Sequence, residues 1–159
     1  MERIIIGADA SGFDLKEVIR EHLTKKGYDI IDIGMYSIDK DIPYYEVAEN
    51  AALKIQSGEA SRAILFCGTG MGVSIVANKF KGVYASVVES EYTGNMAKVI
   101  NNSNVISLGG KIFSDHKAKL TVDLWLNAEH TKGFWDPAAA DFLKASLIEI
   151  KKIEDRNFK

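Results

Sequence analysis

Short runs of apolar, often β-branched residues alternate along the chain with longer stretches in which apolar residues recur every three to four positions. A continuous apolar run of about five residues is typical of a strand buried on both faces, and the longer period is typical of a helix packed on one face. The predicted strands are Arg3–Gly7, Asp29–Gly34, Ala63–Cys67, Tyr84–Val88 and Val105–Leu108. The predicted helices span residues 12–26, 43–57, 71–80, 91–101 and 114–128.

This alternation of strand and helix predicts an open α/β sandwich. Parallel strands need crossover helices, and those helices then cover both faces of the sheet. For five strands we predict the order 2-1-3-4-5, in which the first and third strands are neighbours. Ligands bind beyond the carboxyl ends of such neighbouring strands, at the point where the strand order reverses.

A further helix is predicted after the five-strand unit, over residues 137–154. Asp136 is its expected N-cap, and Pro137 suits a helix start. We expect one domain over residues 1–159, with an α/β core over 1–130, and the last helix docks either on its own domain or on a partner subunit. Its apolar residues at helical spacing are Phe142, Leu143, Leu147, Ile150 and Ile153.

Composition narrows the class of protein. The 159 residues are 47% hydrophobic and 26% charged, with a formal net charge of −2, so the excess of Lys and Arg typical of nucleic-acid binding is missing. No apolar run approaches the roughly 20 residues that cross a bilayer. One cysteine cannot form an internal disulfide, and the three histidines lack zinc-site spacing. We therefore expect a cytoplasmic protein without metal, nucleic-acid or membrane partners.

A glycine-rich turn, LFCGTGMGVSIVANK at residues 65–79, carries the strongest chemical signal. Gly68, Gly70 and Gly72 let the backbone bend so that its N–H groups converge, and such a nest binds phosphate or a developing oxyanion. The turn matches neither the dinucleotide nor the Walker pattern. The alternative interpretation is a plain strand-to-helix turn.

Cys67 stands at the head of that turn. A lone cysteine ending a buried strand is most often inert core, but a position beside a helix N-terminus favours the thiolate. Thr69 is predicted either to donate its hydroxyl to a substrate oxygen or to cap the helix that begins near Met71.

Asp9 follows the end of the first predicted strand, so in the predicted strand order it meets Cys67 across one crevice. It either caps the following helix or contacts substrate. Asn101, Asn102 and Asn104, just before the fifth strand, either form turns or bind sugar hydroxyls.

Five segments together resemble one family of enzymes, that of ribose-5-phosphate isomerase B and galactose-6-phosphate isomerase. The similarity extends to about His130, and the resemblance implies a Rossmann-like fold in dimers or tetramers whose active sites are completed by the neighbouring subunit, without cofactor. The segments are CGTGMGVSIVANK, IIIGADASGFDLK, DIPYYEVA, NNSNVISLGGK and VDLWLNAEH.

The resemblance also implies roles for individual residues. Cys67 would act as the base that moves a proton between neighbouring carbons through a cis-enediolate, and Thr69 would assist proton movement between the oxygens. Asp9 and Asn101 would bind hydroxyls, and Lys111 would retain the cation of the family's GGK position. The enediolate oxygen would be held by the backbone amides around Gly68, Gly70, Met71 and Gly72.

Four positions depart from the family pattern. Ala10 and Ile100 stand where the family has histidines, the second of which opens the sugar ring, and Phe134 and Ala138 stand where it has phosphate-binding arginines. A phosphate would then rest on Lys111, backbone amides and Lys132. Loss of the ring-opening group predicts an open-chain substrate such as erythrulose 4-phosphate. The alternatives are one subunit of a heteromeric galactose-6-phosphate isomerase and a non-catalytic sugar-phosphate-binding protein.

Overall fold

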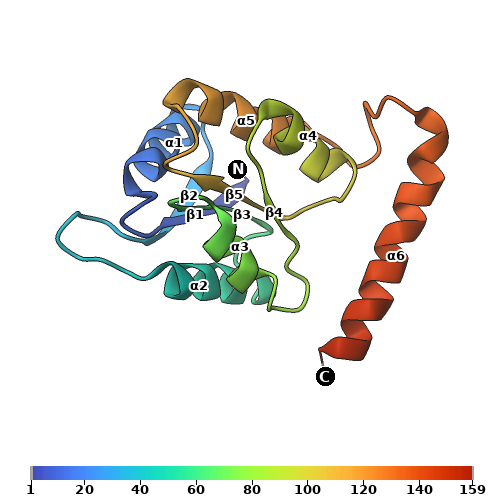
Figure 1. The fold of residues 1–159 in the computed structure, drawn as a ribbon, viewed down its shortest axis with the longest axis horizontal. Helices are drawn as coiled ribbons and strands as arrows, with labels where there is room; N and C mark the ends of the chain where they lie inside the picture. Colours follow the sequence, from blue (N-terminus) through green and yellow to red (C-terminus); the bar gives the residue numbers. More distant parts are fainter. Residues whose placement is uncertain (1, 159) are drawn as a thin grey trace.

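The computed structural model describes residues 2–158 and shows one sheet with helices on both faces (Figure 1). The strands of this sheet are β1 (Arg3–Ala8), β2 (Asp29–Gly34), β3 (Arg62–Cys67), β4 (Ala85–Val87) and β5 (Val105–Gly109). The helices are α1 (Phe13–Lys25), α2 (Tyr44–Gln56), α3 (Met71–Ala77), α4 (Glu91–Val99), α5 (Asp115–Asn127) and α6 (Ala140–Asn157), with a 3₁₀ turn at Pro137–Ala139 before α6.

All strand pairs are parallel, and the order is β2-β1-β3-β5-β4. The predicted α/β/α sandwich is confirmed, but the predicted order 2-1-3-4-5 is wrong for the last two strands. β5 is buried along all five of its residues, whereas β4 has only three residues and is partly exposed. The longer apolar strand therefore takes the inner position, and the short one forms the edge, where it offers little unpaired backbone.

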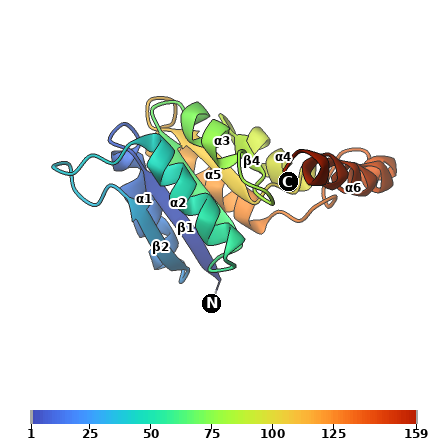
Figure 2. The same ribbon diagram turned by 90° about the horizontal axis from the view of Figure 1, so that it is seen from below.

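Side chains alternate across the sheet and fill two separate cores. Ile4, Ile64 and Ile106 face α1, α4 and α5 on one side. Ile5 and Leu65 face α2 and α3 on the other (Figures 1 and 2). Cys67 belongs to this second core, so its side chain lies on the α2 and α3 face of the sheet.

α6 stands beside the sandwich, beyond the edge strand β4 (Figures 1 and 2). The predicted cap is present, because the Asp136 carboxylate accepts a hydrogen bond from the Ala138 N–H at 3.0 Å. Near the other end the buried Glu154 accepts hydrogen bonds from the Gly82 N–H at 2.6 Å and the Tyr84 hydroxyl at 2.9 Å. Much of the apolar surface of α6 remains exposed, including Phe142 and Ile148.

Candidate active site

Asp9 and Cys67 lie at the same end of the sheet, at the carboxyl ends of β1 and β3, as predicted. β1 pairs directly with β3, with Ala8 opposite Phe66, so the two residues follow neighbouring strand ends. The start of α1 packs closely on this edge: a Cβ on Gly12 would lie 2.6 Å from the Phe66 carbonyl carbon and 2.8 Å from the Cys67 nitrogen. A side chain at position 12 would therefore push the two loops apart.

The turn after Cys67 directs a backbone amide at the sulfur. Gly70 has a φ of +81°, a conformation that favours glycine, and its N–H donates to the Cys67 Sγ at 3.1 Å. The end of β5 supports the turn from beside it, because the Gly110 N–H donates to the Cys67 carbonyl at 2.8 Å and the Lys111 N–H to the Gly68 carbonyl at 3.0 Å. Cys67 is buried, with 6% of its surface exposed.

Thr69, Met71 and Gly72 form the outer rim of the turn. Thr69 is exposed, and its Oγ1 accepts from the Met71 N–H at 3.4 Å, a long contact that leaves the hydroxyl proton free to serve another acceptor. Gly72 lies against the ring of Tyr44, because a Cβ there would be 2.9 Å from the tyrosine Cε2. Sequence reasoning missed Tyr44. The signal was its place after Pro43 at the start of the helix that follows β2, since that helix begins at the same edge of the sheet.

Asp9 follows β1 at this end of the sheet, and it caps the turn into α1. Its Oδ1 accepts a hydrogen bond from the Gly12 N–H at 3.1 Å, so the predicted capping role is present. Burial raises the pKa of the Asp9 carboxyl, the charge of Asp41 adds to the rise, and the Gly12 and Ser11 amides and Lys111 oppose it. Sequence reasoning also missed Asp41, which lies in the loop between β2 and α2.

Lys111 lies beside the same glycine turn. Its Cδ and Cε lie 3.8 Å from the position of a Cβ on Gly68, and the Ser11 Cβ lies 3.5 Å from the same position. The carboxyl ends of β1 and β3 in one chain therefore bring near one another the carboxylates of Asp9 and Asp41, the ammonium group of Lys111, a thiol and a hydroxyl.

Asn101 lies at the opposite end of the sheet from Cys67. It precedes β5, whereas Cys67 pairs with Gly109 at the end of β5, so the length of a strand of roughly 13 Å separates the two levels of the sheet. Asn101 instead lines a hollow of about 220 Å³ together with Tyr84, Asn102 and residues of α6. One chain by itself does not bring Asn101 to Cys67.

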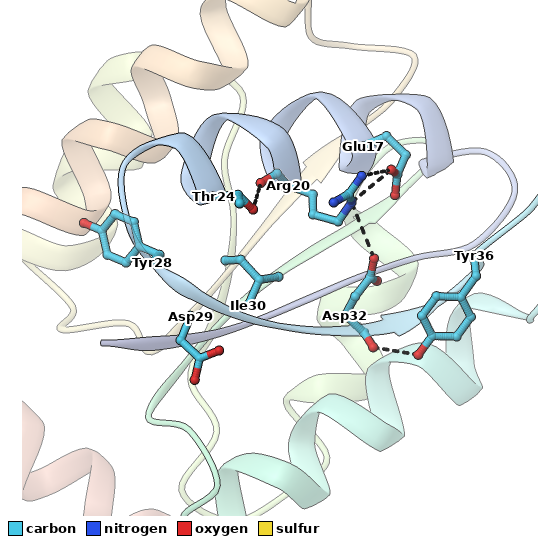
Figure 3. A pocket seen from close by; sticks show the side chains of 8 residues that line it. All are labelled: Glu17, Arg20, Thr24, Tyr28, Asp29, Ile30, Asp32 and Tyr36. Carbon is cyan, nitrogen blue, oxygen red and sulfur yellow. Dashed lines mark hydrogen bonds and ion pairs between the residues drawn. The ribbon is translucent and has the colours of Figure 1, made fainter. Parts of the chain in front are cut away.

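A wider hollow of about 580 Å³ lies between α1 and the edge strand β2 (Figure 3). Its charged groups are already paired: the Arg20 guanidinium contacts the Glu17 carboxylate at 2.7 Å and lies 3.9 Å from Asp32. None of the predicted site residues lines this hollow. We therefore place the candidate site at the carboxyl ends of β1 and β3. The lining residues are Glu17, Arg20, Thr24, Tyr28, Asp29, Ile30, Asp32 and Tyr36.

Residues 2–158 offer neither a candidate membrane span nor a candidate metal site. No described helix combines the length and apolar character of a membrane span. No group of three or more His, Cys, Asp or Glu side chains in this part of the chain lies arranged to hold a metal ion.

Comparison with known proteins gave consistent matches along the chain. The model of the Ribose/Galactose Isomerase family matches residues 4–136. The 4-deoxy-4-sulfo-D-erythrose isomerase of Clostridium sp. strain MSTE9 is 40% identical over 153 residues, which cover 96% of each protein. Ribose-5-phosphate isomerase B of Escherichia coli is 40% identical over 134 residues, 84% of this chain and 89% of the relative.

A third relative and a solved structure agree with these matches. The D-erythrulose-4-phosphate isomerase of Pectobacterium atrosepticum is 38% identical over 133 residues, 84% of this chain and 88% of the relative. The structure of Clostridium thermocellum ribose-5-phosphate isomerase B aligns with a TM-score of 0.87 at 34% identity, covering 97% of this chain and 98% of that one.

Proposed function

Because the chain belongs to the ribose/galactose isomerase family, we propose that it interconverts the aldose and ketose forms of a four-carbon sugar with an anionic group on its last carbon. The observation that carries the proposal is the Gly70 N–H aimed at the Cys67 sulfur, at the end of the sheet that also carries Asp9 and Thr69. A donor to sulfur supports the anionic form that a carbon-acid base requires.

The proposed reaction moves one proton between neighbouring carbons and one between their oxygens. The Cys67 thiolate removes a proton from the carbon beside the carbonyl, and the electron pair forms the double bond of a cis-enediolate. The thiol then returns the proton to the neighbouring carbon. The backbone amides around Gly68, Met71 and Gly72 would stabilise the enediolate oxygen, and loss of one such donor commonly costs about 10² to 10³ in rate. Thr69 would pass a proton between the two oxygens, and Asp9 would hold a substrate hydroxyl.

The size of the substrate follows from ring chemistry. A four-carbon sugar closes a five-membered ring only through a hydroxyl on its fourth carbon, and a phosphate ester or a sulfonate on that carbon removes the hydroxyl. Such a substrate stays open, so the apolar Ile100 costs the reaction nothing. Two of the relatives described above are named for substrates of this kind, one with a sulfonate and one with a phosphate.

The terminal anion of the substrate and the distance of Asn101 from Cys67 both bear on how the protein assembles. Lys111 and the backbone amides of one chain, together with Lys132 of a second copy, would hold the terminal anion. Asn101 would reach the crevice of a second copy, so the active form would be a homodimer or homotetramer with shared sites. Apolar side chains of α6 such as Phe142 and Ile148, exposed in one chain, offer surface for that contact. A reducing cytoplasm would keep Cys67 free.

The test follows the proton. Purified protein is incubated in deuterium oxide with erythrulose 4-phosphate, and in a second arm with the 4-deoxy-4-sulfo analogue, while NMR follows the exchange of the carbon-bound proton and formation of the aldose. We expect turnover in at least one arm and loss of exchange in Cys67→Ala. The relative rates of the two arms identify the terminal anion.

Other outcomes would replace the proposal. Higher kcat/KM with ribose 5-phosphate would contradict the four-carbon substrate. Activity that requires a co-purified paralogue would favour the heteromeric galactose-6-phosphate isomerase, and saturable binding without exchange would favour a non-catalytic binding protein.

A further inference from the structure

Lys16 is a charged side chain that the proposed reaction does not use. It belongs to α1 and is fully buried. Its Nζ donates two hydrogen bonds to the Asp32 carboxylate, at 2.8 and 2.9 Å, and one to the Met35 carbonyl at 2.7 Å. The Glu17 carboxylate lies 2.9 Å from the same atom. All three N–H groups of the ammonium therefore have partners.

The bond to Met35 connects Lys16 to the end of β1. Met35 follows β2 directly, and its N–H donates to the Ala8 carbonyl at 3.0 Å. Ala8 is the last residue of β1, and Asp9 is next in the chain. A continuous series of bonds thus runs from the buried ammonium through the Met35 backbone to the peptide group that Ala8 shares with Asp9.

Close packing makes this series rigid. Gly34 pairs with Ala8 in the sheet and has a φ of +115°. A Cβ on Gly34 would lie 2.7 Å from the Ala8 oxygen and 2.9 Å from the Ala8 nitrogen. The Met35 side chain is itself buried. Because the end of β2 lies this close to the Ala8 backbone, a displacement of Met35 would displace Ala8 as well.

The segment after Asp9 is also bound to Lys16. The Asp9 carboxylate accepts the Gly12 N–H at 3.1 Å, and the Gly12 carbonyl accepts the Lys16 backbone N–H at 2.9 Å. The Lys16 Nζ lies 5.2 Å from the centroid of the Phe13 ring, a cation–π contact at the first residue of α1. Lys16 therefore holds the strand end before Asp9 through its side chain and the turn after Asp9 through its backbone.

The stability of the fold does not by itself require a charge at position 16. Replacing a buried ion pair by apolar side chains of similar volume is often neutral or stabilising, because removing charges from water is costly. An apolar side chain here could pack against Phe13, but it could not donate to the Met35 carbonyl. The feature that only a donor supplies is thus the connection to Ala8 and Asp9.

We propose that Lys16 is a positioning residue, which fixes the chain on both sides of Asp9 so that the Asp9 carboxylate is held in place for a hydroxyl of the substrate. The inference rests on the proposed function, because Asp9 needs a sugar to bind. Lys16 acts through Asp9 rather than on the sugar, since its ammonium is enclosed by Asp32, Glu17 and Met35.

Three variants separate the hydrogen-bond donor from the ion pair. Lys16→Met leaves the Asp32 carboxylate without this cation, so the variant should be destabilised. Lys16→Met/Asp32→Asn removes both charges and should recover part of the lost Tm. Asp32→Asn alone keeps the bond from Lys16 to Met35.

We expect the two variants that lack Lys16 to raise KM for the four-carbon sugar about tenfold with kcat within about twofold, because hydroxyl binding acts equally on ground and transition states. Asp32→Asn should keep the wild-type KM even where its Tm is lowered. A tenfold rise in KM for Asp32→Asn, or a wild-type KM for Lys16→Met/Asp32→Asn, would overturn the inference.

Lys26→Met is the matched control on the same helix. Lys26 lies at the end of α1 opposite to Asp9 and pairs with Asp123 at 2.7 Å. This variant loses an ion pair but no bond toward Asp9, so its KM should match wild type. A rise as large as that for Lys16→Met/Asp32→Asn would contradict a specific role for Lys16.

A double-mutant cycle isolates the route through Asp9. Asp9→Ala alone should raise KM, and adding Lys16→Met/Asp32→Asn to Asp9→Ala should raise it no further. Additive effects in an active enzyme would overturn the inference and leave the proposed function intact.

Amide hydrogen exchange gives a readout that needs no substrate. In Lys16→Met/Asp32→Asn we expect the Met35 N–H to exchange at least about tenfold faster than in wild type, because its bond to Ala8 opens more often, while the Leu65 N–H in the sheet exchanges as before. Unchanged protection of Met35 would overturn the role of Lys16. Loss of that protection, together with a wild-type chain that has no isomerase activity, would overturn the proposed function instead.

Discussion

Asp9 carries two roles that act oppositely on its ionisation. Its carboxylate accepts the Gly12 N–H at 3.1 Å and is proposed to hold a substrate hydroxyl, and both interactions favour the charged form. Burial and the neighbouring Asp41 act against the charge and raise the pKa of Asp9. The site therefore keeps a carboxylate at some expense to the stability of the fold.

We therefore predict that removing the charge of Asp9 stabilises the fold and lowers the activity. The pKa of Asp9 is raised in the folded state. Between the ordinary carboxyl pKa and this raised pKa, the native protein therefore binds more protons than the unfolded chain. The free energy of unfolding falls as pH rises through that interval. Asp9→Asn, which keeps the acceptor for Gly12, should raise Tm at pH 7 by less than about 3 °C, since solvent screens part of the effect. It should also lower kcat/KM.

Melting curves at two pH values check the direction of this effect of Asp9 on stability. At pH 3, where Asp9 is largely protonated in both states, Asp9→Asn and wild type should melt together. A lower Tm for Asp9→Asn at pH 7 would contradict the account.

At the scale of elements, the turn between β3 and α3 depends on its close approach to β5. A Cβ on Gly70 would lie 3.1 Å from the Leu108 carbonyl carbon, at a φ of +81°. Gly58 offers a matched control, because its φ is +77° but a Cβ there meets nothing within 4 Å. The pair separates backbone strain from crowding.

We expect Gly58→Ala to lower the free energy of unfolding by about 1 kcal/mol, and Gly70→Ala by about 2–3 kcal/mol. Gly70→Ala should also cut kcat at least about tenfold, because the shifted amide no longer points at Cys67. Urea unfolding and steady-state rates measure the two effects. Equal losses of stability in both variants would show that the contact with Leu108 adds nothing.

The elements themselves could be predicted because periodicity and turn residues are local properties. The neighbouring position of Asp9 and Cys67 followed from the alternation of strands and helices. The order of β4 and β5 could not be predicted, because it depends on how few of residues 84–88 form a strand. Tyr44 and Asp41 were missed for a related reason: each depends on contacts between segments distant in sequence, which no local pattern reports.

For the whole molecule, the separation of Asn101 from Cys67 makes a prediction about assembly. Cys67→Ala and Asn101→Ala should each be impaired alone. If sites are shared in a dimer, mixing the two after dissociation and reassociation gives about half hybrid dimers, each with one intact site, and so about a quarter of wild-type activity. Gel filtration of the same samples reports their size.

A second mixture of variants serves as the control for shared sites. Mixing Cys67→Ala with Thr69→Ala, whose residues lie in the same turn, should restore no activity. Recovery in that mixture, or none in the first, would contradict shared sites.

The inner position of β5 also has a consequence for how the protein is made. The turn that holds Cys67 is supported by the Gly110 and Lys111 amides, which are synthesised more than forty residues later. While the chain emerges from the ribosome, β1, β2 and β3 can pair before the cysteine turn has its support. The nascent protein thus acquires most of its sheet first, and its thiol takes its final setting only when the last strand is inserted.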